Sequence, residues 1–150
     1  MSVKPVPDGY GTVTPYLIVP DVAKVIDFLK QAFDASEPHP PHKAPDGRVM
    51  HAEVQIGTSR VMMGEPMGEF MPMPAMLHLY VEDCDALYKR AIEAGATPVT
   101  EIADQFYGDR SGGVKDLAGN MWWLSTHKED VPPAELEERA KAAMAARKSG

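Results

Sequence analysis

Apolar residues near the start of the chain follow two different spacings. Residues 14–19 form a short apolar run, which is typical of a buried strand. Asp21 follows, and its side chain can cap a helix by accepting a backbone N–H of the first turn. The apolar residues after it recur three and four positions apart, at Val22, Val25, Ile26, Leu29 and Phe33. The pattern therefore predicts a strand followed by an amphipathic helix.

Alternation then marks two more strands. Val49–Ile56 alternates apolar and polar residues, Gly57 and Thr58 can form a turn, and residues 60–64 continue as an apolar run. A further strand before them stays open, because residues 36–42 contain three prolines, which cannot donate hydrogen bonds to a neighbouring strand. The first half is thus predicted as strand, helix, an optional strand and two strands.

The second half repeats this order. Residues 77–81 form an apolar run, Asp83 can cap a helix, and Gly95 can end it. A constant offset of 62 residues places Leu17 on Leu79, Val19 on Val81, Asp21 on Asp83 and Gly57 on Gly119. One offset that aligns strand, cap and turn glycine indicates two copies of a single βαβββ module.

These patterns divide the chain into four parts. We assign residues 1–65 to a first module, 66–75 to a linker rich in methionine and proline, 76–131 to a second module, and 132–150 to a helical arm that begins at Pro132 and Pro133. The linker is interpreted as a stiff surface connection. The alternative is a pliable cavity wall or a dimer contact, because methionine side chains adapt to different shapes.

Side chains of a strand alternate between its two faces, so the candidate site can be sorted by position. His51, Glu53 and Gln55 lie on one face of their strand, opposite an apolar face that we expect the helices to cover. The neighbouring strands are largely apolar on both faces and carry a few polar groups, as expected of strands around a ligand cavity. The residues expected to share this interior are Tyr16, His51, Glu53, Met63, His78 and Trp123.

Charge and composition narrow the range of molecules that the protein is expected to bind. Fifteen Lys and Arg against 22 Asp and Glu give a net charge of -7, which argues against nucleic-acid binding. The single cysteine, Cys84, cannot form an internal disulfide, and we expect it to be inert. The sequence has no apolar run long enough to cross a membrane and no signal-peptide block at its start, so we expect a cytoplasmic protein.

Two motifs in the second module carry a family resemblance. Residues 104–112 (DQFYGDRSG) and 116–123 (DLAGNMWW), together with the two modules, resemble the PhnB-like branch of the glyoxalase/bleomycin-resistance (vicinal oxygen chelate) superfamily over residues 12–131. The resemblance implies an α+β fold in which two tandem modules form a curved mixed sheet around a cavity, followed by a C-terminal helix. It also implies a homodimer, and often a divalent metal held by one residue from each of four strands.

The sequence departs from that metal pattern. The corresponding positions are Thr14, Val61, Met76 and Trp123, and none of them is a carboxylate or an imidazole. We therefore expect no cofactor at the usual site. A displaced divalent metal stays open, because two histidines and one carboxylate suit iron or zinc. Its ligands would be His51, Glu53 and His78.

Two functions of different classes follow. The first is a binding protein for a small, largely apolar or aromatic molecule, without nucleic-acid or membrane partners. The residues expected to contact this molecule are Tyr16, Gln55, Met63, His78, Tyr80, Arg110 and Trp123. The second is a lyase, isomerase or dioxygenase-type enzyme, with Glu53 as general base, either His51 or His78 assisting, and the displaced divalent metal as an optional component.

Each candidate also has a plain structural alternative. His51 and Glu53 can simply pair with each other or with a neighbouring arginine, and His78 can be a hydrogen-bonded core residue. Arg110 can fix the loop that carries it instead of binding an anion. If the site is apolar, burial should raise the pKa of Glu53, unless His51 or His78 lies close enough to compensate.

Overall fold

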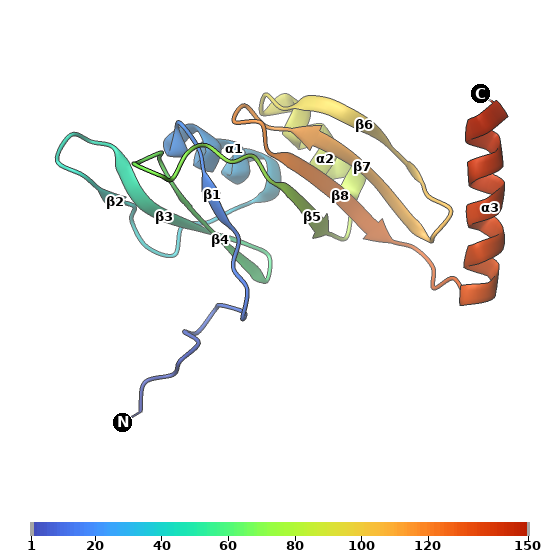
Figure 1. Ribbon diagram of the computed structural model, residues 1–150, viewed down its shortest axis with the longest axis horizontal. Coiled ribbons are helices and arrows are strands. Elements are labelled where there is room, and N and C mark those ends of the chain that lie inside the picture. Colours follow the sequence, from blue (N-terminus) through green and yellow to red (C-terminus); the bar gives the residue numbers. More distant parts are fainter. Residues whose placement is uncertain (1, 150) are drawn as a thin grey trace.

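The structure, a computed structural model, describes residues 2–149 and the side chains as far as residue 147. Two βαβββ modules and a C-terminal helix follow one another along the chain (Figure 1). The first module comprises β1 (Tyr16–Ile18), α1 (Val22–Phe33), β2 (His42–Lys43), β3 (Val49–Ile56) and β4 (Ser59–Gly64). The second comprises β5 (Met76–Tyr80), α2 (Cys84–Glu93), β6 (Thr97–Asp104), β7 (Asp109–Lys115) and β8 (Met121–His127), and α3 (Pro133–Ser149) follows it.

Both modules have the same strand order. The first sheet is ordered β1-β4-β3-β2 and the second β5-β8-β7-β6. The first and last strands of each module are parallel, and the other pairs are antiparallel. The predicted α+β fold with two repeated modules is confirmed, as two four-stranded mixed sheets. A further strand does occur, as the two-residue β2, but it begins only at His42, the last residue of the proline-rich segment 36–42.

Each helix begins at the predicted aspartate. The Asp21 side chain accepts the backbone N–H of Lys24, and that of Asp83 accepts the N–H of Ala86. Both bonds satisfy donors that have no partner inside the helix. The two helices contact each other where the modules meet, and Arg90 of α2 pairs with Asp34 at the end of α1, with 2.7 Å between Nη2 and Oδ1. The helices therefore join the modules.

Leu17, Met63 and Ala52 form one register row across β1, β4 and β3, and each is at most 1 % exposed. They face the core, and Met63 is not part of the wall of the cavity between the modules, so the expectation that it contacts a ligand there is wrong. Met62, its neighbour in β4, occupies the opposite face and lies in the row of Tyr16 and Glu53. Because each face of β4 carries one of the two adjacent methionines, alternation alone could not tell which of them the helix covers.

The repeat also shifts by one residue in the last strand. In the first sheet Tyr16 pairs with Met62. Its counterpart in the second sheet, His78, lies 62 positions later but pairs with Trp123, which lies only 61 positions after Met62. The two hairpins explain the shift. The two strand residues that flank the two-residue turn at 57–58 have their side chains on the core-facing side of the sheet. Those that flank the five-residue loop at 116–120 have theirs on the opposite side. Val61 consequently faces the core, and Trp123 does not.

The loop at 116–120 is held by one buried carboxylate. Asp116 accepts the backbone N–H groups of Ala118 and Asn120 and the indole N–H of Trp122, the last at 2.8 Å. Asn120 in turn accepts the backbone N–H of Ala75 at the end of the linker. The motif in residues 116–123 therefore closes the hairpin and anchors the start of β5.

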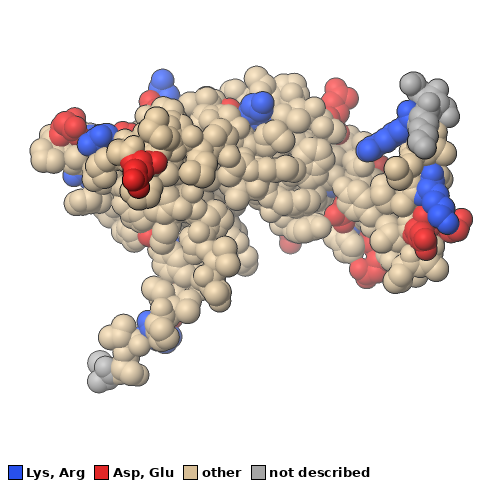
Figure 2. All heavy atoms as spheres, in the orientation of Figure 1, with Lys and Arg blue, Asp and Glu red and all other residues tan. Residues whose placement is uncertain are grey.

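Two segments extend from the modules. The N-terminal arm, defined here as residues 2–15, leads away from β1, and α3 stands at the far end of the second module (Figure 1). Arg139 of α3 binds the Glu129 carboxylate and, at 3.2 Å, the carbonyl oxygen of Phe106. Figure 2 shows charged side chains as separate groups on the face drawn, without a continuous basic patch. No helix within the described residues has the length and apolar character that a membrane span requires.

Candidate functional site

A cavity of about 870 Å³ lies between the two modules. Its walls come from the N-terminal arm, the end of α1, the β3–β4 hairpin, β5, α2 and β8. A volume of this size falls in the range of small-molecule sites, which hold about 300–1,000 Å³. Apolar side chains dominate the wall, at Phe33, Ile56, Val61, Leu77, Leu79, Leu87 and Trp122. Its polar side chains include Arg60, His78 and Tyr80, so the cavity combines apolar surface with a few hydrogen-bonding groups.

His78 and Tyr80 form a stacked pair at the cavity wall. Their ring centroids are 4.8 Å apart, and the planes are inclined by 30°. His78 Nε2 lies 2.8 Å from the Ser125 hydroxyl, and Tyr80 donates to Asp109 at 3.0 Å. The bond to Asp109 raises the pKa of Tyr80, so this phenol stays neutral. Tyr80 is nevertheless 66 % exposed, so this anchored pair presents aromatic surface.

Trp123 lies beside this pair, because it is the register partner of His78. Its ring covers the backbone of Gly113 on β7, where a methyl group would stand 2.5 Å from Cε3 of the ring. The indole therefore requires a glycine beneath it. Of the residues expected to contact a ligand, His78, Tyr80 and Trp123 come together on the second sheet, and the first two line the cavity.

Glu53 is the centre of a second group of side chains, on the first sheet. Its side chain is only 6 % exposed, and four side chains converge on its carboxylate, which we call the Glu53 cluster. His51 Nε2 lies 3.0 Å from Oε1; His39 Nε2 lies 3.1 Å, and Arg60 Nη1 3.7 Å, from Oε2. The Tyr10 hydroxyl donates to Oε2 as well.

The electrostatics of Glu53 follow from these contacts. Burial acts to raise its pKa, but the hydrogen bonds from His51 and Tyr10 and the nearby His39 outweigh it, so the pKa lies below the ordinary value of 4.5. From the sequence, burial is expected to raise the pKa of Glu53 unless His51 or His78 lies close enough to compensate. His51 does lie close enough, and His78 does not. A carboxylate engaged on both oxygens and held ionised favours an organising role over that of a general base.

Tyr16 and Gln55 also belong to this side of the molecule. The Tyr16 hydroxyl lies 3.2 Å from His51 Nδ1, and burial raises the pKa of Tyr16. Gln55 accepts the Nε–H of Arg60 at 2.7 Å, so it positions that guanidinium. The expected neighbours Tyr16, His51 and Glu53 are therefore brought together, whereas His78 and Trp123 stand on the other sheet.

Two members of the Glu53 cluster were not predicted from the sequence. Tyr10 lies in the N-terminal arm, outside every predicted element, and His39 lies in the proline-rich loop. No local periodicity relates either residue to β3. Arg60 is weakly indicated by the sequence, because it is an arginine on the strand next to β3.

The residues do not fit the divalent metal that the resemblance allows. Thr14, Val61, Met76 and Trp123 supply no carboxylate or imidazole, and Val61 faces the core. For a displaced site, His78 lies on a different sheet from His51 and Glu53. Within residues 2–149, no group of three or more His, Cys, Asp and Glu side chains is arranged to hold a metal ion.

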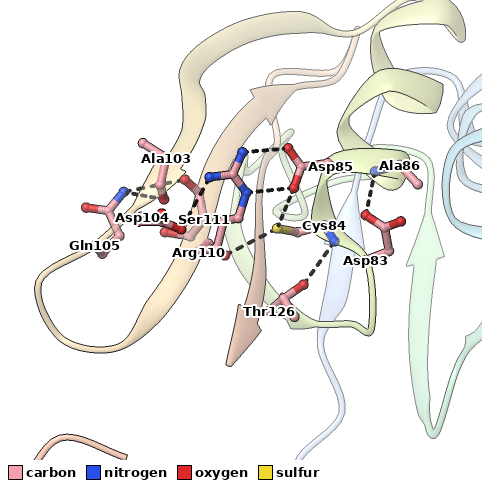
Figure 3. Close-up of polar contacts among 10 residues, drawn as sticks. All are labelled: Asp83, Cys84, Asp85, Ala86, Ala103, Asp104, Gln105, Arg110, Ser111 and Thr126. Carbon is pink, nitrogen blue, oxygen red and sulfur yellow. Dashed lines mark hydrogen bonds and ion pairs between the residues drawn. The ribbon is translucent and has the colours of Figure 1, made fainter. Parts of the chain in front are cut away.

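Arg110 lies away from the cavity, which corrects its expected contact with a ligand. Its guanidinium binds both oxygens of Asp85 at 2.8 and 2.9 Å, and Asp104 at 3.3 Å (Figure 3). Alternation along β7 explains the difference, because Asp109 and Gly113 share one face and Arg110 takes the other. Arg110 therefore fastens β7 to the start of α2.

Cys84, next to Asp85, is buried and free. Its thiol donates to the carbonyl oxygen of Arg110 at 3.3 Å, and its backbone N–H donates to the Thr126 hydroxyl at 2.9 Å (Figure 3). These contacts give Cys84 a place in the attachment of α2 to the sheet.

The repeated modules and the cavity between them agree with a family match. Residues 10–124 match the glyoxalase/bleomycin resistance protein/dioxygenase superfamily. The chain belongs to this superfamily. The chain is also 38 % identical over 149 residues to the uncharacterized protein Mb0911c of Mycobacterium bovis, covering 91 % of this chain and 94 % of that protein. It is 38 % identical to Rv0887c of Mycobacterium tuberculosis, covering 91 % and 84 %.

Solved structures of other proteins share the fold. TioX from Micromonospora sp. ML1 superposes with a TM-score of 0.67 at 24 % identity, over 78 % of this chain and 99 % of that one. The fosfomycin resistance protein FosX from Mesorhizobium loti superposes with a TM-score of 0.58 at 18 % identity, over 79 % and 92 %. At these identities the likeness establishes the fold alone.

Proposed function

We propose that this superfamily member binds a small organic molecule, apolar or aromatic, in the cavity between its modules, without a metal ion. The observation that carries the proposal is the stacked pair of His78 and Tyr80 at the wall of a cavity of about 870 Å³. A planar ligand can continue this stack, because aromatic rings attract one another in offset arrangements.

The polar groups of the cavity support a ligand with one anionic or electron-rich end. Arg60 lines the wall, and Gln55 and Glu53 hold its guanidinium in place. The remaining wall is mainly apolar, which favours an apolar body. The structural neighbour FosX is a fosfomycin resistance protein, so the same fold occurs in a protein named for a small molecule.

The test is a titration with 8-anilinonaphthalene-1-sulfonate, a planar probe with an anionic end. Trp122 lies at the cavity wall, so the bound probe should quench its fluorescence by energy transfer. We expect one probe per chain, and we expect Tyr80→Ala to weaken binding about three- to tenfold through the lost ring contact.

Phe70→Ala is the matched control, because Phe70 is 63 % exposed on the linker, outside the cavity wall. It should leave the probe affinity unchanged. Equal loss in both variants, or binding of many probes without saturation, would contradict the cavity as the site.

We also propose that the chain is a homodimer of the PhnB-like branch. The dimer is supported by large apolar side chains that remain exposed on the sheets, including Tyr16 at 49 %, Met76 at 58 % and Tyr80 at 66 %. Monomeric soluble proteins rarely expose extended apolar patches. The branch is supported by residues 104–112 and by α3. Light scattering on a size-exclusion column should give twice the chain mass of 16.4 kDa, and the chain mass itself would contradict the dimer.

A further inference from the structure

The N-terminal arm places one aromatic side chain in the Glu53 cluster. The phenol of Tyr10 donates to the Glu53 carboxylate, and the guanidinium carbon of Arg60 lies 4.8 Å from the centre of the Tyr10 ring. A carboxylate at the hydroxyl and a cation over the ring face are the two contacts that distinguish a phenol from a plain aromatic ring.

The receiving groups are held in place without Tyr10. His51 and His39 bind the Glu53 carboxylate, and Gln55 binds the Nε–H of Arg60. All of them come from β3, β4 and the loop before β2, and none comes from the arm. The binding position for a phenol is therefore built by the module itself, and Tyr10 occupies it.

The arm, by contrast, has a highly exposed surface. Val3 is 92 %, Val6 46 % and Val13 85 % exposed. The backbone N–H of Tyr10 bonds to Pro7 and the Lys4 side chain to Asp8, both within the arm. Exposed side chains and local hydrogen bonds are features of a segment that detaches at low cost, whereas Pro15 at the end of the arm accepts the backbone N–H of Met62 and anchors that end to β4.

We propose that the Glu53 cluster is a binding position for the hydroxyl-bearing ring of a phenolic ligand, and that Tyr10 is a built-in occupant that such a ligand displaces. The inference goes beyond the proposed function, because it concerns a position next to the cavity and does not require a ligand inside it. Arg60, Gly9 and Gly11 also line the cavity, so release of the arm would open the two spaces to each other.

Competition with a tethered group has a measurable consequence. An external phenol binds only the fraction of molecules whose arm has detached, so its apparent affinity is reduced by that fraction. Removal of the Tyr10 ring should therefore tighten the binding of a free phenol. We expect Tyr10→Ala to bind 2-naphthol about tenfold or more tightly than the original chain.

The experiment compares 2-naphthol with 2-methoxynaphthalene by calorimetry. The two probes share the ring system, but the ether cannot donate a hydrogen bond to Glu53, so the gain in Tyr10→Ala should be confined to the naphthol. Tyr107→Ala, which removes a tyrosine from a different loop, should show no gain. In the Tyr10→Ala background, Arg60→Met should weaken naphthol binding about three- to tenfold by removing the cation over the ring.

A second measurement follows the arm directly in the unmutated protein. With carbon-13 in the tyrosine rings, saturation by 2-naphthol should move the Tyr10 signals to the position of a solvent-exposed tyrosine. Equal naphthol affinity with and without the Tyr10 ring, or Tyr10 signals that stay in place at saturation, would overturn the inference. Naphthol binding that depends on Tyr80 and leaves Tyr10 in place would also overturn it, while supporting the cavity as a ligand site.

Discussion

The indole of Trp123 lies directly over Gly113, its register partner on β7, and leaves no room for a side chain there. Gly113→Ala should therefore displace the ring and lower the free energy of unfolding by about 1–3 kcal/mol, the usual cost of forcing an extra methyl group into a filled space. Urea unfolding gives the free energy, and tryptophan fluorescence reports the ring. In a Trp123→Ala background the same change should cost less. An equal cost in both backgrounds would show that the ring does not fill this space.

Glu53 should stabilise the protein as an ion. Glu53→Gln should lower the free energy of unfolding at neutral pH by about 1–3 kcal/mol, because it weakens the bonds from Tyr10, His39, His51 and Arg60 to a buried acceptor. Because the folded pKa lies below 4.5, this contribution is present above the pKa of an unfolded glutamate and is lost as the pH falls through the folded value.

The measurement for Glu53 is urea unfolding of both proteins from neutral pH down to about pH 3, and the difference between them should shrink below about pH 4.5. Glu101→Gln, at an exposed position of β6, is the matched control and should cost nothing measurable. A difference between original and variant that stays constant down to about pH 3 would mean that the carboxylate charge contributes nothing to stability.

His127 should contribute stability of the opposite pH dependence. Its hydrogen bonds to Asp109, at 2.7 Å, and to Asp130, at 2.8 Å, raise its pKa above 6.5. The contribution is fully present below the unfolded value and is lost as the pH rises through the folded one. His127→Gln should therefore destabilise the protein more at about pH 6 than at about pH 9. A ring titration by NMR checks the pKa directly, and Asp130→Asn should lower it.

Arg110 should control the attachment of β7 to α2. Arg110→Lys keeps the positive charge but cannot bind both oxygens of Asp85 in parallel, so the amides of residues 104–110 should exchange hydrogen faster. Hydrogen-exchange mass spectrometry measures this rate. Arg147→Lys, at an exposed position in α3, should leave these amides unchanged. Unchanged exchange in Arg110→Lys would show that the two parallel bonds do not hold the segment.

The elements of this fold were predictable because their signals are local. Asp21 and Asp83 cap the helices as expected, and Val49–Ile56 is a strand with the predicted bounds. The short β2 could not be predicted, because its residues lie in a proline-rich stretch and pair only through β3. The strands β6 and β7 follow from the repeat more than from their own composition, since residues 109–115 include two glycines and three charged residues.

The sequence by itself determined the two modules, the helix caps and the group of Tyr16, His51 and Glu53, because repeats and alternation relate residues through short stretches of chain. Only the tertiary structure decided which face of each strand the core covers, since the side-chain period of two is the same for either choice. That choice placed Met63 in the core and Arg110 against α2. The structure also brought Tyr10 and His39 to Glu53, because these contacts join segments that no periodic pattern connects.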